Sequence, residues 1–161
     1  MKYTGVGARV TPREMLGEMY SLGERYGLIG AELRSGGALG PDSAFESGAD
    51  AANGPKKIFL PWQKYNNNTS PLFEAPDAAF EMLDIIVPEA KKRSDSVRGM
   101  FARNCMQVMG ETLDDPSEFV ACWMKTKAPV GGTGVTVRIA QYFNIPVFNL
   151  KYDMHLLQMF F

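Results

Sequence analysis

Histidine and cysteine are scarce in this sequence. Of its 161 residues, one is a histidine, His155, and two are cysteines, Cys105 and Cys122. A single histidine excludes a site built from several histidines and argues against a Ser-His-Asp triad. The cysteines lack the C-x-x-C spacing that zinc and redox sites use, so we expect two buried thiols, no metal site and a reducing cytoplasm.

An excess of charge of one sign and a long apolar run are also missing. Lys and Arg total 17 against 18 Asp and Glu, a net charge of -1, which gives no global attraction to nucleic acid or an anionic membrane. The apolar stretches are far shorter than the roughly 20 residues of a transmembrane helix. With 45% apolar residues, the chain can bury one core. We therefore expect one soluble, cytoplasmic domain over residues 1–161.

Strand patterns alternate with helix patterns along the chain. The sequence predicts strands over residues 2–6, 28–34, 57–62, 118–124 and 146–150. It predicts helices that begin at Pro12, Pro41 and Gly131, and another over residues 98–110. Residues 63–98 hold an asparagine run, Pro71 and Pro76 beside one amphipathic stretch at 77–87. We expect an irregular, partly helical insertion there.

The alternation predicts the fold class. Parallel neighbours cannot be joined by tight hairpins, so we expect a three-layer, Rossmann-like α/β fold with a mostly parallel sheet of about five strands and helices on both faces. In such sheets ligands bind outside the carboxyl ends of the strands. Three glycine-rich turns, GVGAR, SGGALG and GGTG, follow predicted strands. They should meet at one edge of the sheet.

These turns are the main functional signal. A glycine turn that opens a helix presents backbone N–H groups and the positive end of the helix dipole, which suits a phosphate. Each turn alone is also ordinary loop geometry, but their joint placement favours a nucleotide-type ligand. Thr133 can add a hydroxyl donor to the third turn. The candidate ligand-binding residues are Gly7, Arg9, Ser35, Gly36, Gly37, Gly40, Arg103, Asn104, Gly131, Gly132, Thr133 and Gly134.

For two of these candidates an alternative stays open. A guanidinium offers a bidentate fork for phosphate, and Arg9 should face the site from its turn. Arg103 and Asn104 lie on a predicted helix, where a structural role at the surface is an equal alternative.

Acidic residues follow the second turn. If Pro41 begins a helix, Asp42, Glu46 and Asp50 fall on one face at a spacing of four. One interpretation is a helix-start residue followed by solvated acids. The other is catalytic, with Asp42 accepting hydrogen bonds from ribose hydroxyls and Glu46 acting at the anomeric carbon as nucleophile or general base.

Several motifs together resemble a known superfamily. They are G-V-G-A-R followed by T-P, then S-G-G-A-L-G-P-D-S-A-F-E-S-G-A, then a strand ending in P-W. This pattern resembles the SLOG superfamily of Rossmann-like proteins, which includes the Lonely Guy phosphoribohydrolases, the DNA-processing protein A domain and nucleotide-signal sensors. The later A-R-N-C-M-Q-V-M-G, F-V-A-C-W, G-G-T-G and I-P-V-F-N-L resemble a branch common in bacteriophages and prophages. The resemblance implies nucleotide-type ligand binding without a further cofactor, often in a homodimer, in a bacterial host cytoplasm.

The sequence departs from that superfamily at two places. The first turn is more often G-S-R, and Ala8 removes the hydroxyl. Lonely Guy enzymes place a catalytic glutamate soon after P-G-G-x-G-T, whereas residues 131–140 read G-G-T-G-V-T-V-R-I-A without an acid. The resemblance therefore implies that a glycosidase activity would rest on Glu46, as in the deoxyribosyltransferase-like relatives.

Three functions follow from these patterns. The first is a nucleotide-binding protein that hydrolyses the N-glycosidic bond of its ligand. The alternative is a non-catalytic sensor or sponge for a nucleotide second messenger, of the kind phages use against host defence. Single-stranded DNA binding is disfavoured by the neutral charge, and we expect neither a nucleic acid nor a membrane as partner.

Overall fold

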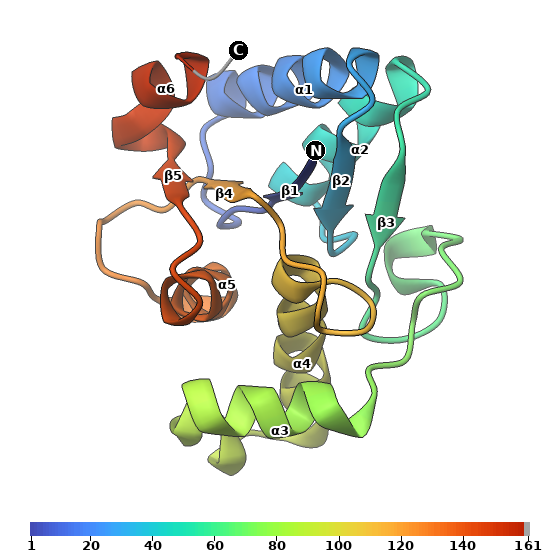
Figure 1. Ribbon diagram of the computed structural model, residues 1–161, viewed down its shortest axis with the longest axis vertical. Helices are drawn as coiled ribbons and strands as arrows, with labels where there is room; N and C mark the ends of the chain where they lie inside the picture. Colours follow the sequence, from blue (N-terminus) through green and yellow to red (C-terminus); the bar gives the residue numbers. More distant parts are fainter. Residues whose placement is uncertain (160–161) are drawn as a thin grey trace.

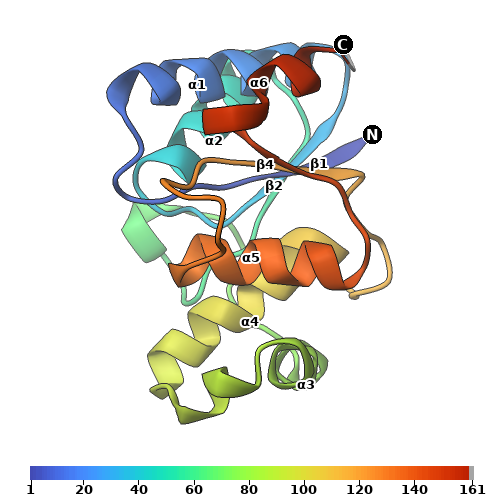
Figure 2. The same ribbon diagram turned by 90° about the vertical axis from the view of Figure 1, so that its left-hand side faces the viewer.

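A five-stranded sheet lies between two layers of helices (Figure 1 and Figure 2). The computed structural model describes residues 1–159. The strands are β1 (Lys2–Gly5), β2 (Glu32–Ser35), β3 (Lys56–Ile58), β4 (Phe119–Cys122) and β5 (Val147–Asn149). Their order is β3-β2-β1-β4-β5 and every pairing is parallel. The predicted three-layer α/β fold is confirmed, with a sheet that is parallel throughout.

Helices cover both faces of the sheet. In Figure 2, α1 (Arg13–Leu28), α2 (Pro41–Ala51) and α6 (Leu150–Gln158) lie above the strands, and α4 (Asp95–Met109) and α5 (Gly131–Tyr142) lie below them. α3 (Asp77–Ile86) packs against α4 beyond the sheet. Two short 3-10 helices, η1 (Tyr65–Asn67) and η2 (Pro88–Lys92), flank α3 in the chain.

Each face of the sheet carries its own apolar core because side chains alternate along a strand. On β1, Tyr3 enters the core under α1 and α2, where its ring centroid lies 4.8 Å from that of Tyr26. The next residue, Thr4, points to the opposite face and donates to the backbone oxygen of Gln107 on α4 at 2.7 Å. The core on that face contains Cys105 and Val120.

Most predicted elements are present, with shifted ends. The second strand begins at Glu32 rather than residue 28, because α1 continues through Gly27 to Leu28 and the turn comes at Gly30, with φ of +78°. β3 ends at Ile58 instead of residue 62. The chain after β5 forms α6, which the sequence did not predict, and the Asn149 side chain caps it by accepting from the Lys151 N–H.

The helix starts are predicted more closely. Pro41 and Gly131 are the first residues of α2 and α5, as expected. Pro12, expected as the first residue of α1, is its cap residue. The two cysteines are free and buried, which confirms that expectation.

The segment at residues 63–98 is irregular around η1, α3 and η2. α3 is tied to α4 by a bidentate ion pair in which Arg98 Nη1 lies 2.7 Å from Asp84 Oδ1. No helix within residues 1–159 is long and apolar enough to cross a membrane.

Candidate functional site

All three glycine-rich turns contribute to one cavity of about 510 Å³ at the carboxyl edge of the sheet. The first turn contributes Gly7 to Val10, the second contributes Ala38, Leu39 and Asp42, and the third contributes Val130 to Thr133. The first and third turns follow β1 and β4, the neighbouring strands between which the chain order reverses. Ligands of parallel α/β sheets bind at such a reversal.

The start of α5 presents unpaired backbone donors to this cavity. Gly131, Gly132 and Thr133 occupy the first helical turn, whose N–H groups have no partner within a helix. Gly131 has φ of +65°, a conformation that a side chain would strain. Gly134 is buried against Pro129 and does not line the cavity. The third turn therefore combines backbone N–H groups with the positive end of a helix dipole, an arrangement that favours anions.

The first turn faces the start of α5 across the same cavity. Its backbone is fixed to the sheet because the Val6 and Ala8 N–H groups donate to Ala121 and Trp123 oxygens at 3.1 and 3.0 Å. Arg9 is exposed and lines the cavity.

The second turn uses its own polar groups internally. Asp42 Oδ2 accepts from the Gly36 and Ala38 N–H groups, each at 3.2 Å, and Ser35 donates to the Gly5 oxygen at 2.6 Å. Arg103 donates to the Gly36 oxygen. A Cβ on Gly36 would overlap the Arg103 guanidinium, so this close approach requires glycine. The predicted ligand contacts Ser35, Gly36, Gly37 and Gly40 do not line the cavity.

Asp42 and Arg103 form a buried pair of opposite charges in the cavity wall. They are 4% and 6% exposed. Burial raises the pKa of Asp42 to about 6, although Arg103 and the two N–H groups oppose the rise. Burial also lowers the pKa of Arg103, which Asp42 opposes. The surface placement given as an alternative for Arg103 and Asn104 is wrong, since both side chains are buried and line the cavity. Both make structural hydrogen bonds, Arg103 to the Gly36 and Phe59 oxygens and Asn104 to the Gly132 oxygen.

A chain of side-chain amides joins α4 to the third turn. Asn104 Nδ2 donates to the Gly132 oxygen at 3.1 Å, and Asn104 Oδ1 accepts from Gln107 Nε2 at 3.1 Å. These bonds fix the orientation of both amides. Within the described part of the chain, three buried side-chain atoms have no hydrogen-bond partner: Tyr3 Oη, Arg103 Nε and Gln107 Oε1. Such atoms are rare, and the Arg103 and Gln107 atoms belong to lining residues of this cavity.

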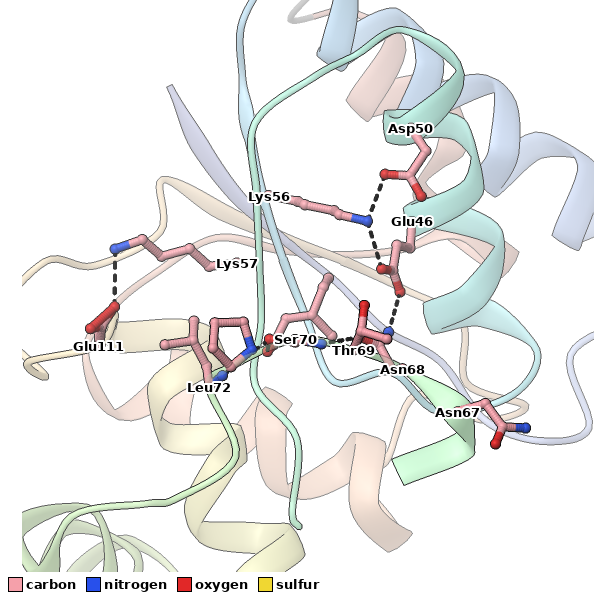
Figure 3. A pocket seen from close by; sticks show the side chains of 12 residues that line it. Glu46, Asp50, Lys56, Lys57, Asn67, Asn68, Thr69, Ser70, Leu72 and Glu111 are labelled. Carbon is pink, nitrogen blue, oxygen red and sulfur yellow. Dashed lines mark hydrogen bonds and ion pairs between the residues drawn. The ribbon is translucent and has the colours of Figure 1, made fainter. Parts of the chain in front are cut away.

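Glu46 lies in a different pocket (Figure 3), of about 680 Å³. Lys56 Nζ lies 2.8 Å from Glu46 Oε2 and 2.6 Å from an oxygen of Asp50. Asn68 donates to Glu46 Oε1 at 2.9 Å. The structure therefore does not bring the two predicted catalytic carboxylates into one cavity, since Asp42 lines the first and Glu46 the second.

Sequence reasoning missed an apolar wall formed by the first half of α4. Val97, Met100 and Phe101 line the cavity, followed on the same helix face by Asn104. Met100, Phe101 and Asn104 follow Val97 by three, four and seven residues, a spacing that indicates one face of a helix. The sequence predicts that this helix begins at Arg98, which leaves Val97 outside it and obscures the pattern.

No family model, curated protein or solved structure matches this chain. The resemblance to the SLOG superfamily therefore stays a prediction. Within residues 1–159 no cluster of three or more His, Cys, Asp or Glu side chains could hold a metal ion.

Proposed function

We propose that this protein binds a nucleotide or nucleotide derivative in the cavity where the three turns meet. The observation that carries the proposal is the start of α5, where the unpaired N–H groups of Gly131, Gly132 and Thr133 open into the same cavity as Arg9. Backbone donors, a helix dipole and a guanidinium together favour a phosphate over a neutral group.

The size and charge of the cavity support this proposal. A volume of about 510 Å³ lies within the range of pockets for small organic ligands. Its lining holds three arginines, Arg9, Arg93 and Arg103, against one aspartate, Asp42. The cavity is thus locally positive in a protein whose net charge is -1, which attracts a small anion without attracting nucleic acid in general.

Binding without chemistry is the function best supported, as in a sensor or sponge for a nucleotide signal. Glu46 lines the other pocket, and one oxygen of Asp42 holds the second turn. From the family resemblance we further infer a cytoplasmic homodimer, which sedimentation of the purified protein would test.

Titration calorimetry with nucleoside monophosphates and dinucleotides tests the binding proposal. Arg9→Ala should weaken binding by about tenfold, the order of one charge-assisted hydrogen bond. Thr133→Val should weaken it by about three- to tenfold by removing one neutral donor. Arg13→Ala removes an equal charge from an exposed residue outside the cavity and should bind like wild type. Equal losses in Arg9→Ala and Arg13→Ala would show that the anion does not sit in this cavity.

Hydrolysis of the N-glycosidic bond is a second candidate, favoured by the Asp42 carboxyl. Its pKa of about 6 is suited to proton transfer near neutral pH. Incubation with nucleoside monophosphates, assayed for released base, separates the two predicted acids. Loss of release in Asp42→Asn alone would place the chemistry in the cavity, and loss in Glu46→Gln alone would place it in the second pocket. Absence of release from wild type leaves the binding function.

A further inference from the structure

The cavity has two chemically different ends, and α4 forms the wall of both. The C-terminal half of α4 reaches the sheet, where Gln107 accepts from Thr4 of β1 and Asn104 holds the Gly132 oxygen. The N-terminal half projects away from the sheet toward α3 (Figure 1). It lines the cavity with Val97, Met100 and Phe101.

We propose that the bound nucleotide lies along α4, with its phosphate at the start of α5 and its base against Val97, Met100 and Phe101. The base is held there by stacking and shape rather than by hydrogen bonds to its edges. The site consequently recognises the sugar and the phosphate of the nucleotide and binds all four common bases. This inference rests on the proposed function and names the ligand class that the site accepts.

The dimensions along α4 suit a ligand of this length. The Asn104 side chain contacts the first turn of α5 through the Gly132 oxygen. Val97 precedes Asn104 by seven residues, which is about 10 Å along a helix axis. A nucleoside monophosphate spans that separation, whereas inorganic phosphate or a sugar phosphate does not reach the apolar wall.

The outer end offers contact surface but few groups that could distinguish bases. The Arg93 guanidinium lies 5.9 Å from the centroid of the Phe101 ring, which makes a cation-aromatic platform for a planar base. The asparagine, glutamine, aspartate and threonine side chains of the lining come from the sheet end. The segment before α4 adds Arg93 and Tyr65 to the lining, and the Arg103 guanidinium lies 5.4 Å from the centroid of the Tyr65 ring.

The mouth of the cavity carries the same apolar character. Three large apolar side chains line the cavity while 67%, 69% and 66% exposed: Val10 after the first turn, Leu39 in the second and Val130 before the third. Large apolar side chains with this exposure gain from being covered. A base bound against the α4 wall would cover these three side chains, which have no donor or acceptor to offer to the edge of the base.

Calorimetry with ribose 5-phosphate, AMP, GMP, CMP and UMP tests the inference. Each nucleotide should bind at least about tenfold more tightly than ribose 5-phosphate, and the four should agree within about tenfold. The double variant Val97→Thr with Met100→Gln should lose about tenfold for every nucleotide and keep its affinity for ribose 5-phosphate. Both residues lie outside the core cluster on that face, and unchanged sugar-phosphate binding reports an intact fold. Met159→Gln, an exposed methionine outside the cavity, is the matched control.

The outcomes separate this inference from the function on which it rests. If ribose 5-phosphate binds as tightly as the nucleotides, the base site is wrong and the phosphate site stands. A preference of more than about tenfold for one base would show edge recognition and overturn the inference. Equal losses for sugar phosphate and nucleotides in the double variant would also overturn it. If none of the five compounds binds, the proposed function itself fails and the inference fails with it.

Discussion

Replacing Asp42 with asparagine should stabilise the folded protein at pH 8. The carboxyl is 4% exposed, and burial raises its pKa from the ordinary value of 3.8 to about 6. The folded state therefore binds the proton more tightly than the unfolded state. As a result, the contribution of Asp42 to the free energy of unfolding falls as the pH rises from about 3.8 through 6 and becomes constant above about 7.

The magnitude follows from the two pKa values. The raised pKa of Asp42 costs the folded state about 3 kcal/mol at pH 8, where the carboxyl is ionised in both states. It costs about half of that at pH 5, where the carboxyl is mostly protonated in the folded state and mostly ionised in the unfolded state. Asparagine has no charge to bury, and its amide oxygen can still accept from the Gly36 and Ala38 N–H groups. The variant should thus gain stability at both pH values, and the gain should be about 1–2 kcal/mol larger at pH 8.

Urea unfolding of wild type and Asp42→Asn at pH 5 and pH 8 measures this difference. Asp50→Asn removes a carboxylate that is exposed and paired with Lys56, so it should change stability by no more than about 0.5 kcal/mol. A gain that is the same at both pH values, or a loss of stability at pH 8, would refute the assignment of Asp42 as a buried, ionised and unfavourable group.

Three further predictions concern the residues around the cavity. Gly36→Ala should lower the free energy of unfolding by about 1–3 kcal/mol in denaturant titrations, because its Cβ would meet Arg103 and Gln107. The control Gly17→Ala, which has open space at its Cβ, should raise the free energy of unfolding by about 0.5–1 kcal/mol. Burial raises the pKa of Cys105 and of Cys122 to about 12. Iodoacetamide at pH 8 should therefore alkylate neither thiol in the folded protein and both thiols in urea, as measured by mass spectrometry. Rapid labelling without urea would contradict the burial of these thiols. Asn104→Asp cannot donate to the Gly132 oxygen and should weaken phosphate binding by about tenfold in calorimetry, whereas an unchanged affinity would mean that this hydrogen bond does not position the turn.

The features that local chemistry decides could be predicted from the sequence. Pro41 and Gly131 mark helix starts because proline suits the first helical turn and glycine permits a positive φ. The end of α1 was missed because Leu28 is apolar and looks like strand, yet it is exposed at the last helical position.

The division of the acidic residues between two pockets could not be predicted. Asp42 and Glu46 share a helix face by spacing, but their partners come from elsewhere in the chain. Arg103 approaches Asp42 from α4, whereas Lys56 and Asn68 hold Glu46 beside β3. Contacts between residues far apart in sequence decide which side chain faces which cavity, and neither residue type nor spacing encodes them.

The hydrogen bond from Asn104 to Gly132 restricts how this protein can vary. It is a side-chain contact at one position of α4, so sliding that helix by a single residue would present Arg103 or Cys105 to the α5 turn instead. Insertions and deletions in the loops around α3 are tolerable only if they leave the register of α4 unchanged. Residues 63–94 can therefore change in length, whereas the register of α4, which begins at Asp95, cannot change.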